Sequence, residues 1–242
     1  MAKRKSQARG MIPRTGVPEP LSDLSGLVKT MTWPSGQAIH RVHLDSYDGN
    51  AFNPGMKGNA RFSPIQDVAG ASIPTLYGGT TFDCAAMETI FHDVPFAPGL
   101  KTFDKAKLTD QAYSIVTPRR DLVLADLSAT ALKALGLRRS ELIDTEKDQY
   151  PETRKWAEAI HAQCPAVDGL CWVSVRTIAL APSCFSAIGP QPLISLLRVR
   201  REASSMISAF TQTCWCSRSA SASILSGEPD PDSPFPEGSW VE

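Results

Sequence analysis

Apolar and polar residues alternate in a short run near residue 40, and further apolar runs follow along the chain. The run IHRVHL at residues 39–44 predicts a strand that buries one face. Residues 73–77 (IPTLY), closed by a glycine pair, predict a second short strand, and residues 121–127 (DLVLADL) predict a buried one. A turn that leads into a strand is expected at residues 169–174 (GLCWVS).

Residues at helical spacing predict three helices among these strands. Thr80 and Thr81 favour the start of one that runs to about Phe91, because hydroxyl side chains cap the free N–H groups of a first turn. A second helix is expected near residues 129–135, and a third begins near Pro151, which suits a first helical turn. The inward stripe of this third helix is formed by Trp156, Ala159 and Ile160.

These patterns divide the chain into three regions. Residues 1–35 are rich in Pro, Gly, Ser and charge, and predict a loose basic leader with the composition of a solvated terminus. Residues 36–176 hold the predicted strands and helices and form the expected domain. In residues 177–242 serine is frequent, the end is rich in proline and acid, and no strand–helix rhythm is found. This last region is expected to be anomalous, either disordered or frameshifted.

Composition narrows the class of protein. The 242 residues suffice for one substantial domain, and 25 basic against 25 acidic residues give no reason to expect a nucleic-acid or membrane partner. No apolar stretch approaches ~18 residues and no signal-peptide core follows the basic start, so a cytoplasmic location is expected. The six cysteines contain no CxxC pair, so we expect free thiols and no metal site.

The signatures of several common enzyme classes do not occur in the sequence: it has no GxGxxG, GxxxxGK[ST], HExxH or GxSxG. The four histidines are scattered, and each is expected to be a surface or structural residue. What remains is a spaced set of polar residues, in which a tyrosine precedes a helical glutamate by eleven positions. The set consists of Arg41, Arg61, Tyr77, Glu88 and Ser174.

Five segments carry this set in order: IHRVH, ARFSP, PTLYGGTTFDCAAMETIFHDV, YPETRKWAEAI and DGLCWVSVR. Together they span about residues 38–176, and they resemble the RES family, which is named after its arginine, glutamate and serine. The resemblance implies an α+β fold like that of ADP-ribosyltransferase toxins, a mixed sheet with flanking helices that holds NAD⁺ in a cleft. It also implies a toxin that consumes NAD⁺ as substrate and is blocked by a separate helix-turn-helix antitoxin.

The chemistry of the five residues agrees with that implication. Arg41 and Arg61 suit the pyrophosphate of NAD⁺, because a guanidinium fork matches phosphate oxygens. Tyr77 is expected to stack on a ring of the substrate. Glu88 is expected to stabilise the oxocarbenium-like state formed when the nicotinamide–ribose bond breaks. Ser174 would bind and orient an arginine or a phosphate. Glu88, with Arg61 and Tyr77, forms the predicted catalytic group, and neither a cofactor nor a metal is implied.

Three readings of the activity stay open at this stage. The first is cleavage of NAD⁺ by hydrolysis or phosphorolysis, the second is transfer of ADP-ribose to a protein, and the third is an inactive remnant that binds a partner. The third is raised by the sequence after Arg176, where family members continue toward Gly-Asp-Arg but this chain reads TIALAPSCFSAIG. With GC-rich codons, another reading frame yields the expected continuation, so a frameshift near residue 176 is a hypothesis that the gene sequence tests.

Overall fold

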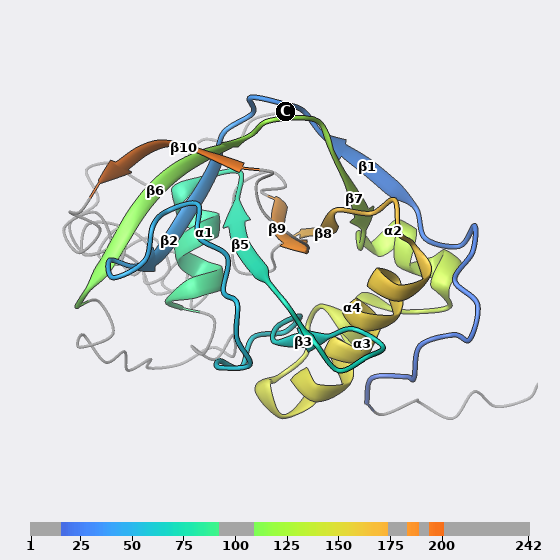
Figure 1. The fold of residues 1–242 in the computed structure, drawn as a ribbon. Helices are drawn as coiled ribbons and strands as arrows, with labels where there is room; N and C mark the ends of the chain where they lie inside the picture. The colour runs from blue at the N-terminus through green and yellow to red at the C-terminus, as the bar shows by residue number, and fades with distance from the viewer. Residues whose placement is uncertain (1–15, 92–108, 174–182, 189–193, 201–242) are drawn as a thin grey trace, which may run out of the picture. The chain divides into compact units, whose positions relative to one another are not determined.

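The computed structural model describes residues 16–91, 109–173, 183–188 and 194–200. Within these ranges eight strands form one mixed sheet, with helices packed against it (Figure 1). The expected α+β class is confirmed. None of the helices in the described ranges combines the length and the apolar character needed to cross a membrane.

The sheet has the strand order β1-β7-β8-β9-β5-β2-β6-β10, and all neighbours are antiparallel except β7 and β8. Its strands are β1 (Thr30–Trp33), β2 (Ile39–Leu44), β5 (Thr75–Gly79), β6 (Gln111–Pro118), β7 (Leu122–Asp126), β8 (Gly169–Val173), β9 (Ser183–Ile188) and β10 (Ile194–Arg200). A two-stranded ladder pairs β3 (Ile65–Gln66) with β4 (Ser72–Ile73). The helices are α1 (Phe82–Thr89), α2 (Ala129–Leu132), α3 (Arg139–Leu142) and α4 (Tyr150–Gln163), with 3-10 turns at Lys133–Leu135 and Lys147–Gln149.

Helix α1 begins where the sequence predicts. Thr81 is its N-cap, and the Thr81 Oγ1 accepts a hydrogen bond of 3.2 Å from the backbone N–H of Cys84. The helix packs on β2 and β5 through a buried face of small residues. Gly79 permits this close packing, because a Cβ there would lie only 2.8 Å from the Cβ and Sγ atoms of Cys84. Strand β5 and helix α1 are thus joined by a tight connection.

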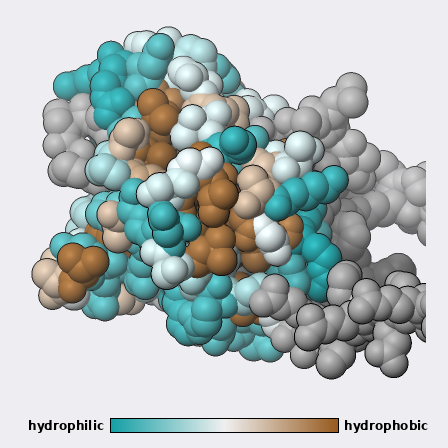
Figure 2. Space-filling view, turned by 90° about the vertical axis from the view of Figure 1, so that its right-hand side faces the viewer, coloured by the Kyte–Doolittle hydropathy of each residue, from teal (hydrophilic) through white to brown (hydrophobic). Residues whose placement is uncertain are grey.

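Two apolar cores lie on opposite faces of the sheet, since neighbouring residues of one strand belong to different cores. In β8, Leu170 and Trp172 contribute to one core, and Cys171 contributes to the other. The first core is shared with α4 through Trp156 and Ile160, each 1% exposed, which confirms the predicted inward stripe for these two residues. Figure 2 shows one side of the molecule, where apolar side chains gather in the middle and hydrophilic ones surround them.

The predicted loose leader is wrong for its described part, residues 16–35. Leu24 is fully buried, and its backbone N–H donates to the Oε1 of Gln163 in α4 at 2.8 Å. The indole N–H of Trp156 donates to the carbonyl of Pro18 at 2.7 Å, and β1 pairs with β7. Because the anchoring groups belong to elements far along the chain, local composition does not reveal them. Residues 1–15 lie outside the described residues.

The sequence after Arg176 also differs from expectation, since β9 and β10 occur where no strand was predicted. Strand β9 lies inside the sheet between β8 and β5, and β10 pairs with β6. A strand inside a sheet can lack alternation, which explains why β9 was missed. The remaining residues after Val173 lie outside the description, and the frameshift stays a hypothesis.

Among the cysteines, Cys164 and Cys171 are free thiols as expected. Cys84 is disulfide-bonded, so the expectation of a free thiol is wrong for that residue. Strand β6, whose residues 111–116 pair with the whole of β2, was also not predicted from the sequence.

Candidate active site

A cavity of about 500 Å³ opens beside β2, and its walls come from β2, β5, the end of α1 and residues 51–60. These elements bring together residues that are up to 48 positions apart in the chain, from Arg41 to Thr89. The polar side chains of the wall that matter here are Arg41, His43, Lys57, Ser63, Tyr77 and Glu88. Three of the five residues singled out from the sequence therefore share one cavity.

Glu88 lies on the last turn of α1 and forms an ion pair with Arg61. The Glu88 Oε2 is 3.6 Å from the Arg61 Nη1, and the two side chains are 9% and 7% exposed. A carboxylate and a guanidinium this deeply buried stabilise one another, because either alone would have to give up water without a charged partner. The Arg61 side chain does not belong to the described cavity wall; it lies behind the wall and reaches the cavity through Glu88.

Tyr77 is held in place by its hydroxyl and by its ring. The backbone N–H of Phe62 donates to the Tyr77 hydroxyl at 3.0 Å, and the ring meets Trp172 edge to face with centroids 6.0 Å apart. Burial raises the pKa of the Tyr77 hydroxyl above its usual value, so the group stays protonated at neutral pH. The side chain is a neutral, fixed part of the cavity wall.

Arg41, on β2, supplies a buried cation to the cavity wall. Its Nη1 donates to the carbonyl oxygens of Gly49 at 2.6 Å and Ala51 at 2.7 Å, which fastens residues 45–53 to β2. Burial lowers the pKa of the Arg41 guanidinium to about 10, so the side chain is still charged at neutral pH. Within the described ranges no carboxylate lies within ion-pair distance of Arg41.

Two more wall residues, His43 and Lys57, were not predicted as site residues. His43 follows Arg41 by two positions on β2, and its ring nitrogens lie 2.8 Å from the Leu44 carbonyl and 2.7 Å from the Ser114 hydroxyl. Burial lowers the pKa of the His43 imidazole, which favours the neutral form. The hydrogen bonds of His43 thus agree with the predicted structural role, although the residue also lines the cavity.

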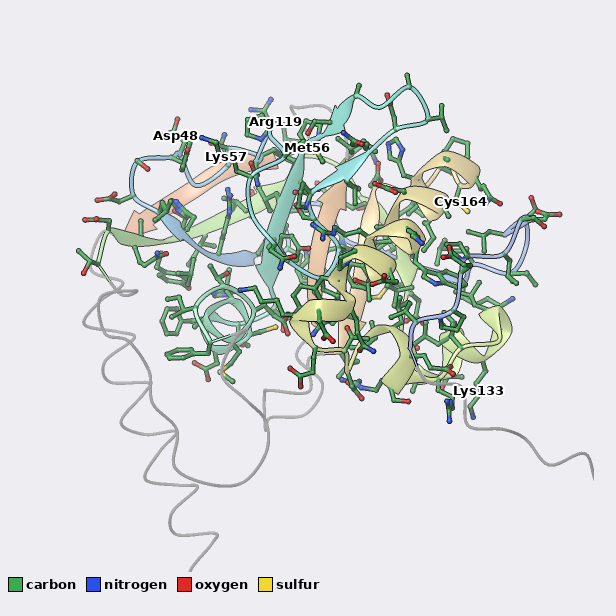
Figure 3. All side chains as sticks on the ribbon, turned by 90° about the horizontal axis from the view of Figure 1, so that it is seen from below. Asp48, Met56, Lys57, Arg119, Lys133 and Cys164 are labelled. Carbon is green, nitrogen blue, oxygen red and sulfur yellow. The ribbon has the colours of Figure 1, made fainter. Side chains whose placement is uncertain are left out.

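Lys57 lies on an exposed stretch between the segments that carry Arg41 and Arg61, with Met56 as its neighbour (Figure 3). In the described ranges it has no acidic side chain within ion-pair distance. The feature of the sequence that could have indicated Lys57 as a site residue is its position in a glycine-containing loop between two motif segments. Among the described residues the cavity therefore has two cations without a carboxylate partner, Arg41 and Lys57, and one carboxylate, Glu88, whose charge is balanced by Arg61.

Arg61 is also held from the side of α4. Tyr150, the first residue of α4, places its ring under the guanidinium, with 5.6 Å between the Arg61 Cζ and the ring centroid. The hydroxyl of Thr153, one helical turn later, donates to the Arg61 carbonyl. Tyr150 begins the fourth of the motif segments, YPETRKWAEAI. The sequence therefore marked this residue as part of a motif but did not indicate that it contacts Arg61.

The structure thus brings Arg41, Tyr77 and Glu88 to one cavity, with Arg61 directly behind Glu88. Ser174 lies outside the described residues. In the described ranges, no three His, Cys, Asp or Glu side chains come close enough together to hold a metal ion. The arrangement can bind an anion through its two cations and can place a fixed negative charge against a group that becomes positive during a reaction.

Comparisons with known proteins agree with the fold and with the motif order. The family model described as the RES domain matches residues 38–192, well over half of the chain. A comparison with curated protein sequences gives no match. Among solved structures, a chain of the M. tuberculosis MbcT–MbcA toxin–antitoxin complex is similar, with a TM-score of 0.55 and 12% identity over 74% of this chain and 90% of that one. At that identity the likeness shows a shared fold, whereas the family match covers the motif-bearing segments themselves: the chain belongs to the RES domain family.

Proposed function

We propose that this chain is a toxin-type enzyme that cleaves NAD⁺ at the nicotinamide–ribose bond and so lowers cellular NAD⁺. The observation that carries the proposal is the nearly buried Glu88 carboxylate, fixed by Arg61 at the wall of a cavity that also presents two cations, neither with a carboxylate partner in the described part of the chain. Membership of the RES domain family and the resemblance of the fold to a chain of a toxin–antitoxin complex support the toxin role.

In the proposed reaction the bond between the ribose C1′ and the nicotinamide nitrogen breaks, and nicotinamide leaves with the bonding electron pair as a neutral base. The ribose carbon and ring oxygen then share a positive charge, which the Glu88 carboxylate stabilises from the cavity wall. The oxygen of water, or of inorganic phosphate, forms the new bond to C1′ and releases its proton to solvent. The product is ADP-ribose or its 1-phosphate.

The remaining wall residues bind the substrate in this proposal. Arg41 and Lys57 attract the pyrophosphate, because each is a cation without a described carboxylate partner. This changes the sequence-based assignment in one respect, since Arg61 is paired with Glu88 and holds that carboxylate rather than a phosphate. Tyr77 presents a neutral ring for stacking, and Ser174 keeps its proposed role in orientation. The cytoplasmic location and the separate helix-turn-helix antitoxin likewise belong to the proposal.

The test uses the full chain, purified and incubated with NAD⁺ labelled in the adenylate part, with and without inorganic phosphate. Free labelled ADP-ribose indicates hydrolysis, ADP-ribose phosphate indicates phosphorolysis, and label on protein indicates a transferase. Glu88→Gln keeps the size of the side chain and removes its charge, so turnover should fall about 100- to 1000-fold. Intact NAD⁺ with the unaltered protein, or equal turnover by Glu88→Gln, would contradict the proposal.

A further inference from the structure

Helix α4 contacts the segment that carries Arg61 at several points. The Tyr150 ring, 3% exposed, lies 5.6 Å from the Arg61 guanidinium carbon, and the Thr153 hydroxyl donates to the Arg61 carbonyl. Further along the same helix, the Oε1 of Glu158 accepts a hydrogen bond of 3.0 Å from the backbone N–H of Gln66. The segment from residue 61 to residue 66 is therefore docked on α4 at both ends.

The Arg61 guanidinium makes fewer hydrogen bonds than it has N–H donors. A guanidinium has five N–H donors, and the Arg61 Nε is buried without a hydrogen-bond partner in the described ranges. The group contacts the Glu88 carboxylate, at 3.6 Å, and the face of the Tyr150 ring. With so few hydrogen bonds to fix it, its direction depends strongly on the aromatic ring beneath it.

We propose that Tyr150 is a positioning residue, which holds the Arg61 guanidinium against Glu88 by stacking beneath it, while Thr153 fixes the Arg61 backbone. The proposal rests on the proposed function insofar as Glu88 acts on the ribose. Tyr150 contacts the Arg61 guanidinium and is not among the residues that line the described cavity, so its effect on the reaction passes through Arg61 to the orientation of Glu88. It should therefore alter the turnover number and leave the binding of NAD⁺ nearly unchanged.

The experiment compares Tyr150→Phe, which keeps the ring, with Tyr150→Leu, which removes it. Stacking of a cation on an aromatic ring at a desolvated site corresponds to about a 5- to 30-fold effect on an equilibrium or a rate. We expect Tyr150→Leu to lower kcat by about that factor with KM within about twofold, and Tyr150→Phe to restore most of the turnover. Ile160→Ala is the matched control, because it removes core contacts from the same helix without touching Arg61.

A second readout follows Arg61 directly and does not depend on turnover. Protons that lie over an aromatic face are shifted upfield in NMR spectra, so the Arg61 Nε–H signal should be displaced in the unaltered protein. Tyr150→Leu should move this signal toward the usual arginine position, and both Tyr150→Phe and Ile160→Ala should leave it in place.

These outcomes separate the two proposals. If the unaltered protein does not cleave NAD⁺, the proposed function fails, and the Nε–H signal alone then decides whether Tyr150 orients Arg61. If it cleaves NAD⁺, the positioning role is overturned by an unchanged kcat in Tyr150→Leu, by an unmoved Nε–H signal, or by an equal loss of kcat in Ile160→Ala. A fall in kcat together with a moved signal, both restored in Tyr150→Phe, supports it.

Discussion

The ion pair between Arg61 and Glu88 should stabilise the fold by an amount that a double-mutant cycle can measure. Two unit charges 3.6 Å apart attract one another by about 5 kcal/mol at an effective dielectric constant of about 20. Solvent screens this attraction little, because only 7% and 9% of the side chains are exposed. Removal of one partner leaves the other charge buried, and such changes typically cost about 3 to 5 kcal/mol.

The cycle consists of Arg61→Met, Glu88→Met and the double variant, each of which replaces a charged side chain by an apolar one of comparable length. Either single variant should lose about 3 kcal/mol of the free energy of unfolding, and the double variant should be at least as stable as the weaker single one. The expected coupling energy is therefore about 3 kcal/mol or more, because the two single losses would otherwise add. Urea unfolding followed by fluorescence provides the measurement, since Trp33, Trp156 and Trp172 are buried. Effects that add within about 0.5 kcal/mol would refute the reasoning, because two independent side chains would give that result.

Three further predictions address the walls of the cavity and their support. Gly79→Ala should lower the free energy of unfolding by about 1 to 3 kcal/mol, measured by urea unfolding, because the new Cβ would lie 2.8 Å from Cys84 side-chain atoms. Lys57→Met should raise the KM for NAD⁺ about three- to tenfold without a change in kcat. The control Lys133→Met, on a distant part of the molecule (Figure 3), should change neither constant. Equal KM values in the two variants would show that Lys57 does not bind the substrate. Because the pKa of His43 is lowered in the folded chain, the unfolded chain binds this proton more readily. The contribution of His43 to the free energy of unfolding is therefore complete above about pH 6.5 and is lost as the pH falls below that value. Urea titrations between about pH 8 and pH 5 should show that the free energy of unfolding falls less steeply in His43→Gln than in the unaltered protein.

Local features of the fold could be predicted from the sequence because neighbouring residues determine them. The helix after Thr81 is one example, since its cap is a hydrogen bond across three residues. The strand at Ile39–Leu44 is another, although the prediction that it buries only one face is wrong, since the adjacent residues Arg41, Val42 and His43 are all buried. The motif order then led to the family, which the family match confirms over residues 38–192.

Features that depend on distant parts of the chain could not be predicted in this way. The burial of Leu24 requires Gln163 and the rest of α4, so the composition of the first 35 residues indicated a loose leader. The pairing of Arg61 with Glu88 likewise follows from how a loop and a helix meet in space. Sequence patterns therefore identified both residues and assigned a phosphate-binding role to Arg61, but they did not reveal that its guanidinium faces a carboxylate.

The short connection between β5 and α1 has a consequence for how the RES domain family can diversify. Tyr77 and Glu88 belong to one continuous strand–helix unit, and only Thr80 and Thr81 separate its two elements. An insertion or deletion there would displace the carboxylate relative to the tyrosine, so the interval between them has little freedom to change in length. Residues 45–59, by contrast, form a loop that contributes another part of the cavity wall, where length and sequence can vary without moving Glu88. Natural variation in substrate or acceptor preference should therefore accumulate in that loop, while the strand–helix unit keeps a constant spacing.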